Sequence, residues 1–445
     1  MFLFAWLATF SSYLMRSSTS MTFVVMAREF GWDLTSQGLF LSSFLITYGL
    51  SNWAAVLVHR WPTKRTLVLS LGLSALSFGA VPLVANLLPN GYAILICRLL
   101  AGCFEGAVYP CVTALVVRWA AVRENSLVTS VVFGGPNVAN VIGLFLSPLI
   151  IESGLGWRAV YFFIATFVLA WLAVFAAVGT DSPATLGRTR LSPPCLQLNE
   201  AELAERPPPR DHTRGGVPWK LFLTRRETIA LLWTHGLSCN AAFYLILSWL
   251  PTYCEAHLGV SLRASGGLSA LPFVCNMIAS VAFGRLSDFL LQRKWSVILV
   301  RKIFQAVSLG VPAVCLLLIG VLQTDVAATI ALSCFAVASM GAFASGSVSN
   351  FRDLFGPFAA SLFAVSNGLA QFSGLVAVVT VGPLVEAYGW AAPFVVAFII
   401  GVVGALVFVA FGKADLIVPV SDALQMESLV EAEAEGDDEH ENVTA

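Results

Sequence analysis

The sequence predicts an all-α polytopic membrane protein, and two observations carry that prediction. Of its 445 residues, 58% are hydrophobic and only 11% are charged, whereas soluble domains contain about 25% charged residues. Apolar runs of about 20 residues, each long enough to cross a hydrocarbon core of about 30 Å, recur along nearly the whole chain. Segments of about 10 residues with alternating polarity, typical of a transmembrane β-barrel, are missing from the sequence.

Twelve membrane-spanning helices are predicted in order along the chain. They cover about residues 1–26, 36–58, 66–87, 91–119, 126–151, 157–178, 227–252, 264–287, 297–321, 325–349, 357–385 and 389–411. A loop over residues 179–226, rich in proline and charge, divides the spans into six and six. We therefore expect six-helix bundles at residues 1–178 and 227–411, joined by this central loop.

The chain ends in an acidic tail over residues 412–445. Residues 413–445 hold ten acidic residues and one lysine. A segment with this much charge and few aromatic residues cannot bury enough apolar surface to fold. We expect the tail to be disordered.

The distribution of Lys and Arg predicts how the chain is oriented. Of the 25 such residues, Arg16 and Arg98 lie deep inside predicted spans. Arg28, Arg158 and Arg263 lie in the gaps or at the span ends on one side, and the other 20 lie in the gaps or at the span ends on the opposite side. The positive-inside rule places this basic side in the cytoplasm. Both termini and the central loop are therefore expected to be cytoplasmic.

The fifth and eleventh spans end in similar sequences. Residues 143–157 read GLFLSPLIIESGLGW and residues 374–390 read GLVAVVTVGPLVEAYGW. Each segment runs from Gly-Leu through Pro-Leu to an acidic residue and then Gly-Trp. This self-similarity indicates two parallel repeats of six helices, as in six-plus-six transporters.

Three charged residues lie well away from the ends of their predicted spans: Arg16, Arg98 and Glu105. A charge at mid-membrane costs about 2.5–3.5 kcal/mol on insertion scales, so it usually faces a cavity or a partner. Arg98 and Glu105 are seven residues apart and share a helix face, but side chains lean toward the helix N-terminus, which argues against a direct pair.

The chemistry of these three residues favours anion binding coupled to protons. A guanidinium matches carboxylate or phosphate oxygens, and burial favours the protonated form of a carboxylic acid, so Glu105 is able to take up and release a proton. Structural alternatives stay open: Arg98 could snorkel to the membrane interface or form a structural ion pair. Glu105 could contact Arg16 or backbone donors.

Weaker polar candidates within the spans are Tyr48, Tyr109, Asn240, Tyr244, Asn367 and Gln371. A single polar residue in a membrane helix more often bonds to a neighbouring helix than to a substrate. For His235, near the start of the seventh span, two roles stay open: a proton site, and a capping or interfacial position, which we favour.

Several motifs resemble one transporter family. RLLAGCFEGAVYP (98–110) resembles the family's fourth-span pattern R-x(6)-E-G-x-x-[YF]-P, and TDSP (180–183), PWKLFLT (218–224), SWLPTY (248–253) and VRK (300–302) resemble further family markers. The chain is identified as similar to the anion:cation symporter family of the major facilitator superfamily, which includes sialin, vesicular glutamate transporters and phosphate transporters. The resemblance implies a major facilitator fold with 12 transmembrane helices in two pseudo-symmetric six-helix bundles.

The resemblance also implies roles for individual residues. Arg16 and Arg98 map onto anion-binding positions and Glu105 onto a coupling position. From the weaker polar candidates, and not from the resemblance, we add Tyr48, Tyr109, Asn240, Tyr244 and Asn367 as expected substrate contacts. His59 stands where the superfamily has a gating aspartate, and Asp288 keeps its second-half counterpart. Leu41 and Cys239 replace a histidine and an arginine of vesicular glutamate transporters, which argues against a glutamate-specific carrier.

We therefore expect a secondary active transporter for inorganic phosphate or a small organic anion, coupled to protons or sodium by alternating access. Its expected partners are the anionic solute and the lipid bilayer, with no nucleic acid and no cofactor besides the coupling ion, and we expect a monomer. The alternative is a non-transporting receptor or scaffold on a transporter fold, which would bind without flux. An enzyme is not expected because metal-ligand spacing, a nucleophile elbow and paired catalytic carboxylates are missing from the sequence.

Overall fold

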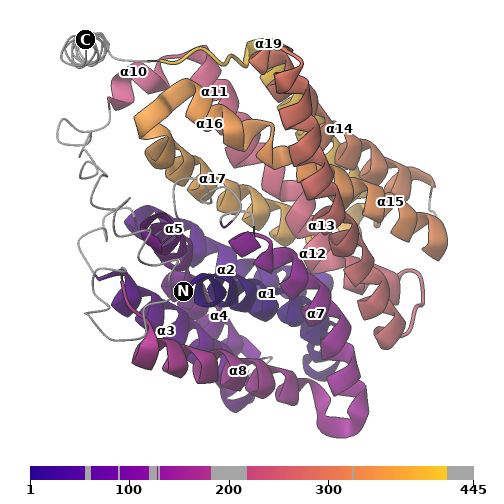
Figure 1. The fold of residues 1–445 in the computed structure, drawn as a ribbon. Helices are drawn as coiled ribbons and strands as arrows, with labels where there is room; N and C mark the ends of the chain where they lie inside the picture. Colours follow the sequence, from indigo (N-terminus) through magenta and orange to yellow (C-terminus); the bar gives the residue numbers. More distant parts are fainter. Residues whose placement is uncertain are drawn as a thin grey trace, which may run out of the picture.

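The computed structural model describes residues 1–55, 62–88, 91–119, 128, 131–181, 218–322 and 325–417. Regular structure in these residues is helical throughout. Figure 1 shows helices α1 to α8 grouped together, with α10 to α19 for the most part above and to the right of them. We call the first group the N-terminal bundle and the second the C-terminal bundle.

The helices of the N-terminal bundle follow the predicted spans. They are α1 (Phe2–Phe30), α2 (Leu34–Ala55), α3 (Thr63–Val84), α4 (Tyr92–Glu105), α5 (Val108–Trp119), α7 (Gly135–Ile150), the π-helical turn η3 (Ile151–Leu155) and α8 (Gly156–Val178). The fourth predicted span is thus divided after Glu105. At the division, Gly106 lies against Ser51 of α2, and any side chain at position 106 would collide with that serine.

The C-terminal bundle contains more interrupted helices. They are α10 (Trp219–Leu223), α11 (Arg226–Leu232), η5 (Trp233–Ser238), α12 (Cys239–Ala256), α13 (Leu262–Gln292), α14 (Val297–Leu322), α15 (Val326–Met340), η6 (Gly341–Ala344), α16 (Ser347–Phe355), η7 (Gly356–Phe358), α17 (Ala359–Val379), α18 (Val381–Tyr388) and α19 (Ala391–Phe411). The seventh predicted span contains the π-helical segment η5, and the tenth changes to a 3-10 turn in η6 before α16.

The prediction of an all-α polytopic membrane protein is confirmed. In the described part of the chain, nine helical segments are long and apolar enough to cross a membrane, and one of them, Gly135–Val178, covers two predicted spans. Helices α1 and α2 are long but less apolar, because they contain polar residues such as Ser17, Ser18 and Ser42. These side chains are buried inside the protein. Small polar side chains of this kind join helices in membranes. The number of twelve crossings stays a prediction.

The sequence repeat corresponds to a repeated corner. Gly156 (φ 71°, ψ 176°) begins α8 and Gly389 (φ 77°, ψ 175°) precedes α19, and this backbone region is nearly restricted to glycine. The tryptophan after each glycine contacts the first long helix of its own bundle. Trp157 donates to Glu29 Oε2 of α1 (2.5 Å), and the Trp390 ring lies 5.1 Å from that of Tyr253 in α12.

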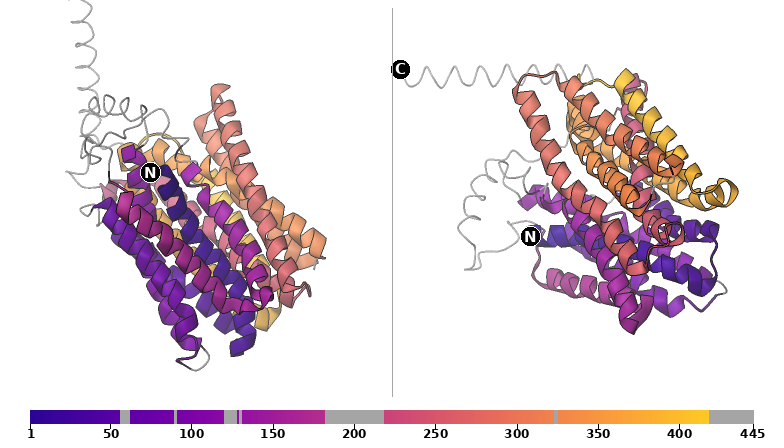
Figure 2. Two further views of the ribbon diagram at one scale, coloured as in Figure 1. Left: turned by 60° about the horizontal axis from the view of Figure 1, so that its bottom comes forward. Right: turned by 90° about the vertical axis from the view of Figure 1, so that its right-hand side faces the viewer.

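The two bundles pack against each other along the lengths of their helices (Figure 2). Helix α2 packs against α17, α7 against α13, and α1 against α12. Polar contacts join the bundles at the end where α1 connects to α2. Arg28 pairs with Glu255, the Thr35 hydroxyl donates to Glu386 Oε2 (2.9 Å), and Glu152 Oε1 accepts from the backbone N–H of Arg263 (3.2 Å).

The predicted central loop and tail lie largely outside the described residues. At the start of the loop, Asp181 Oδ1 accepts from the backbone N–H of Lys64 (2.6 Å), so it caps the N-terminus of α3. Beyond α19, the backbone N–H of Ile417 donates to the Leu354 carbonyl (2.8 Å) and fastens residues 412–417 to α16. Most of the acidic tail, from residue 418, is not among the described residues.

Candidate functional site

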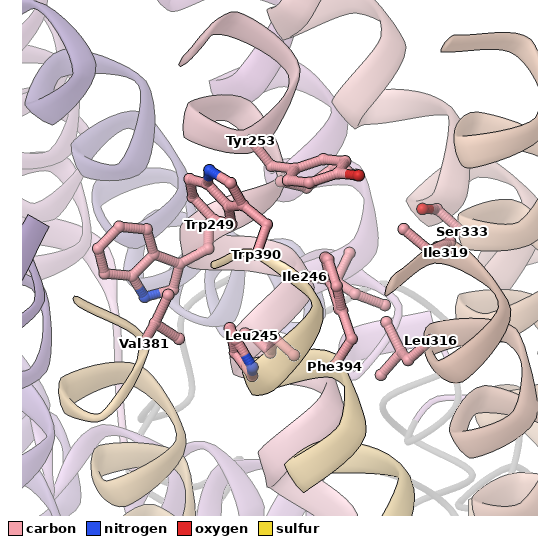
Figure 3. A pocket seen from close by; sticks show the side chains of 12 residues that line it. Leu245, Ile246, Trp249, Tyr253, Leu316, Ile319, Ser333, Val381, Trp390 and Phe394 are labelled. Carbon is pink, nitrogen blue, oxygen red and sulfur yellow. The ribbon is translucent and has the colours of Figure 1, made fainter. Parts of the chain in front are cut away.

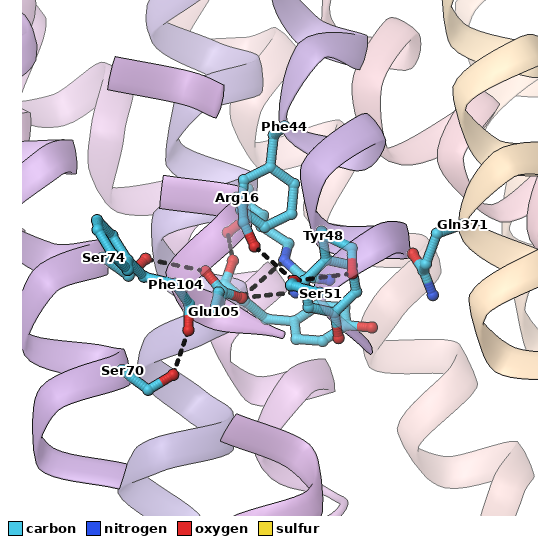
Figure 4. A network of polar contacts seen from close by, with 12 residues as sticks. Arg16, Phe44, Tyr48, Ser51, Ser70, Ser74, Phe104, Glu105 and Gln371 are labelled. Atoms are coloured by element: carbon cyan, nitrogen blue, oxygen red, sulfur yellow. Dashed lines mark hydrogen bonds and ion pairs between the residues drawn. The ribbon is translucent and has the colours of Figure 1, made fainter. Parts of the chain in front are cut away.

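Two of the predicted charges, Arg16 of α1 and Glu105 of α4, form an ion pair inside the N-terminal bundle (Figure 4). Arg16 donates to Glu105 Oε1 from Nη2 (2.5 Å) and from Nε (3.0 Å). Ser74 of α3 donates to the other carboxylate oxygen, Oε2 (3.3 Å). The two residues are 6% and 1% exposed. Each charge is therefore compensated by the other, as buried charges require.

Aromatic rings enclose the Arg16 guanidinium. Its Cζ atom lies 4.7 Å from the ring centre of Tyr13, 4.7 Å from that of Phe44 and 4.2 Å from that of Tyr48. Cations over aromatic faces are attracted by the ring quadrupole, more strongly where water is excluded. We call Tyr13, Phe44 and Tyr48 the aromatic cage. It fixes the position of the guanidinium from the side of α1 and α2.

The remaining nitrogen of the Arg16 guanidinium, Nη1, contacts the C-terminal bundle. It donates to the Tyr244 hydroxyl of α12 (3.2 Å), which donates to Gln371 Oε1 of α17 (3.0 Å). Gln371 Nε2 donates to the carbonyl of Asn367 (3.3 Å). A chain of polar contacts therefore runs from Ser74 in one bundle to Asn367 in the other.

The remaining predicted substrate contacts lie next to this chain. Asn240 and Asn367 are partly buried and precede Tyr244 and Gln371 by one helical turn. Tyr109 of α5 lies behind the cage, with its ring 6.4 Å from that of Tyr13. Tyr48 and Tyr244 contact Arg16, whereas Asn240, Asn367 and Tyr109 are neighbours of its contacts. Their roles in substrate binding stay predictions.

Arg98 lies apart from the Arg16–Glu105 pair. Its Nη2 donates to the Leu41 carbonyl (2.9 Å) and its Nε to the Phe40 carbonyl (3.4 Å), both in α2. The residue is 7% exposed, so its side chain is turned into the protein and does not snorkel to the surface. The sequence argument that Arg98 and Glu105 do not pair agrees with this geometry.

The two predicted gating residues are placed differently. Asp288 is exposed on α13, and its gating role stays a prediction. His59 lies outside the described residues.

The prediction that His235 caps a helix or lies at the interface is wrong. It is 2% exposed in η5, with Nδ1 at 2.8 Å from the Ser366 hydroxyl and its ring stacked at 5.1 Å on Phe343. His235 is therefore an interior residue of the C-terminal bundle.

A small pocket lies within the C-terminal bundle and is not suited to an anion (Figure 3). Its wall is almost entirely apolar, with Trp249, Tyr253, Trp390 and Phe394 among the lining residues, and its volume is about 10 Å³. A space of this size holds at most about one water molecule. The candidate site is therefore the Arg16 centre.

Sequence reasoning missed part of this centre. Tyr13 precedes Arg16 by three residues on the same helix, and this spacing alone could have identified it as a neighbour. Phe44 and Ser74 come from α2 and α3, and no local pattern marks them. Their proximity to Arg16 and Glu105 follows from how the helices pack, which a single sequence does not encode in any local signal.

The family model described as Major Facilitator Superfamily matches residues 5–337. A probable chloroplastic anion transporter of Oryza sativa subsp. japonica is 29% identical over 407 residues, which are 90% of this chain and 66% of the relative. The chloroplastic sodium-dependent phosphate transport protein 1 of Arabidopsis thaliana is 27% identical over 423 residues, covering 93% of this chain and 79% of the relative.

The voltage-gated purine nucleotide uniporter SLC17A9 of Homo sapiens is 29% identical over 415 residues, covering 92% of this chain and 90% of the human protein. Among solved structures, a bacterial homologue of the human lysosomal transporter Spinster, in an inward-facing and unoccupied conformation, superposes with a TM-score of 0.73 at 11% identity. It covers 92% of this chain and 95% of its own. At this identity the likeness concerns the fold alone.

Proposed function

Because the chain belongs to the major facilitator superfamily, whose members among its relatives are transporters and not enzymes, we propose that it carries a small anion across a membrane. Transport would proceed by alternating access of the two bundles around a central site. The observation that carries the proposal is the buried Arg16 guanidinium, which contacts Glu105 in one bundle and Tyr244 in the other.

Arg16 is suited to an anion that displaces one of its present partners. The guanidinium offers several N–H donors in a plane, which match carboxylate and phosphate oxygens. Tyr244 is a neutral hydroxyl 3.2 Å from Nη1, and an anionic oxygen in its place forms a stronger, charge-assisted bond. Tyr48, Tyr109, Asn240 and Asn367 then supply or border the remaining surface of the anion.

Glu105 is the proposed coupling residue. As a carboxylate it occupies Nε and Nη2 of Arg16 and cancels the charge that an anion requires. Protonation of Glu105 removes this competition and leaves Arg16 as an uncompensated cation. Proton uptake and anion binding would thereby favour each other, which is the condition for moving both in the same direction. Sodium remains the alternative coupling ion.

The relatives name the anions to be tested. One is called a phosphate transport protein and another a purine nucleotide uniporter, so inorganic phosphate, a purine nucleotide and a small organic acid such as ascorbate form the first panel. We further propose that both termini are cytoplasmic, that the protein acts as a monomer, and that Asp288 and His59 contribute to gating.

Uptake into proteoliposomes tests the proposal. The full chain is reconstituted, and entry of each radiolabelled anion is measured with and without an inward proton or sodium gradient. Wild-type protein is expected to accumulate at least one anion, and Arg16→Gln to abolish that uptake. Arg158→Gln is the matched control, because it removes an exposed arginine that pairs with Glu29 on the same bundle. Binding without flux would support a receptor or scaffold instead.

A further inference from the structure

Helices α2 and α4 are joined by hydrogen bonds from side chains of one helix to backbone carbonyls of the other. Thr47 of α2 donates to the Leu99 carbonyl (2.7 Å) and Ser51 to the Gly102 carbonyl (3.1 Å). Arg98 is the long side chain that crosses in the other direction, from α4 to the Phe40 and Leu41 carbonyls. It therefore binds α2 one turn before Phe44.

Phe44 lies between two guanidinium groups. Its ring centre is 5.3 Å from Cζ of Arg98 and 4.7 Å from Cζ of Arg16. A π face attracts a cation on either side. Both cations therefore contact the same ring, and the position of that ring affects both.

The Arg98 guanidinium is bound to α2 through two of its five N–H donors. Its Nε and Nη2 are directed at main-chain carbonyls, its ring contacts are with Phe23 and Phe44, and it is 7% exposed. A carbonyl pair cannot leave the site as a displaced water or hydroxyl can, because both oxygens belong to the backbone of α2. Anion binding through these two donors would require α2 to separate from α4.

From these contacts we propose that Arg98 is a positioning residue: it holds the turn of α2 that presents Phe44 and Tyr48 to Arg16, and it does not contact the anion. The inference rests on the proposed function, in which Arg16 binds the anion. It revises the role that the family resemblance implies for Arg98. The cage would loosen without Arg98, and Arg16 would bind the same anions less tightly.

Two measurements on the purified full chain test this role. The first is the thermal unfolding midpoint of Arg98→Gln, Phe44→Leu and the double variant. Each single substitution is expected to lower the midpoint, and the double variant to lower it by clearly less than the sum of the two, because the Arg98–Phe44 contact is lost in both. Additive losses would overturn the proposal, whether or not a transported anion is known.

The second measurement is the KM for inorganic phosphate in proteoliposomes, with sulfate and ascorbate as competitors. Arg98→Gln and Phe44→Leu are each expected to raise KM about tenfold, with kcat and the order of preference among the anions unchanged. Arg98→Lys, which keeps a cation over Phe44 and one donor for a carbonyl, should restore most of the affinity. A changed order of preference in Arg98→Gln would make Arg98 a ligand and contradict the proposal.

Thr47→Val is the matched control. It removes one hydrogen bond between α2 and α4 and leaves Arg98 and the cage in place. We expect a lower unfolding midpoint with an unchanged KM. If Thr47→Val raises KM as much as Arg98→Gln does, general adhesion of the two helices explains both, and the specific role of Arg98 is refuted. Failure of the wild-type chain to carry phosphate would count against phosphate as the substrate, while the unfolding experiment would still decide the role of Arg98.

Discussion

Arg16 and Glu105 compensate each other's charge in the interior of the protein. Removing one member of a buried ion pair typically costs about 3–5 kcal/mol, because the other charge is left uncompensated. The aromatic cage and the Tyr244 hydroxyl add contacts that a lone arginine in a membrane helix would lack. The same features that stabilise the pair also hold Arg16 at the meeting point of the bundles.

The variant Glu105→Gln separates binding from coupling. Glutamine keeps the size of the side chain but removes the charge that competes for Arg16 and the proton that would drive uptake. We expect exchange of labelled for unlabelled anion to continue with higher affinity, while accumulation driven by a pH gradient is lost. Glu29→Gln, which alters a carboxylate outside this centre, should leave accumulation intact. Gradient-driven accumulation by Glu105→Gln would exclude Glu105 as the coupling residue.

His235 is predicted to tolerate replacement by phenylalanine. Its Nε2 is buried without a hydrogen-bond partner among the described residues, and Phe343, Phe351 and Phe363 surround the ring. Phenylalanine removes an unsatisfied group worth about 1–3 kcal/mol but leaves the Ser366 hydroxyl without His235. We expect an unfolding midpoint close to that of wild type and unchanged transport. Loss of transport with normal stability would instead indicate a functional proton on His235.

At the scale of helices, the sequence predicts where the chain is helical better than where the helices break. The tenth predicted span reads as one apolar run, yet η6 separates α15 from α16. Two side chains of α14 bind the backbone at this break: Arg301 donates to the Ser345 carbonyl (3.0 Å), and Gln305 Oε1 accepts from the Ser347 N–H (2.9 Å). Backbone groups freed inside a membrane protein need such partners. These partners lie more than 40 residues away in the sequence, so no local pattern reveals the break.

The charged residues of the candidate site could be predicted from the sequence, but most of their contacts could not. The cost of buried charge identifies Arg16, Arg98 and Glu105 from the sequence alone, and helix geometry separates Arg98 from Glu105. The pairing of Arg16 with Glu105 was one alternative among several, because it depends on how α1 and α4 face each other. The contact of Arg98 with α2 carbonyls could not be predicted from the sequence, since every residue has a backbone carbonyl whatever its side chain.

The two glycine corners offer a test at this scale. A Cβ atom at Gly156 or Gly389 would meet nothing within 4 Å, so any loss of stability in Gly156→Ala or Gly389→Ala arises from the backbone conformation. We expect each substitution to cost about 1–3 kcal/mol, measured as a lower unfolding midpoint. Gly310→Ala in α14 is the control: it also has open space but lies within a helix, where alanine should stabilise by up to about 1 kcal/mol. Equal effects at all three positions would contradict the conformational explanation.

At the scale of the whole molecule, the bundles are joined by polar contacts at the end where α1 connects to α2. Glu255 and Glu386 of the C-terminal bundle contact Arg28 and Thr35 of the N-terminal bundle, and Gln37 donates to Thr252 (3.3 Å). In the proposed orientation, with both termini in the cytoplasm, this end faces away from the cytoplasm. The contacts would have to break when the site opens to that side.

Weakening these contacts is expected to favour the opposite conformation. Polar contacts with at least one exposed partner, as here, contribute about 0.2–1 kcal/mol each, so the double variant Glu255→Gln, Glu386→Gln should shift the equilibrium only a few-fold. The measurement is the labelling rate of a cysteine at position 240, in a chain without other cysteines, by a membrane-impermeant thiol reagent added on that side. A faster rate than in the parent chain is expected, and an unchanged or slower rate would show that these contacts do not hold that end closed. Glu29→Gln, which breaks a contact within one bundle, should not change the rate.

The polar chain from Ser74 through Glu105, Arg16 and Tyr244 to Gln371 has a consequence for evolution. Its members come from five helices on both sides of the central loop, so neither half of the gene can drift independently at these positions. A lineage that exchanges Glu105 for a neutral residue must also alter Arg16 or acquire another counter-charge. Among descendants of a common ancestor, these positions should therefore change together, and a shift in the transported anion should be visible as joint substitution in both halves.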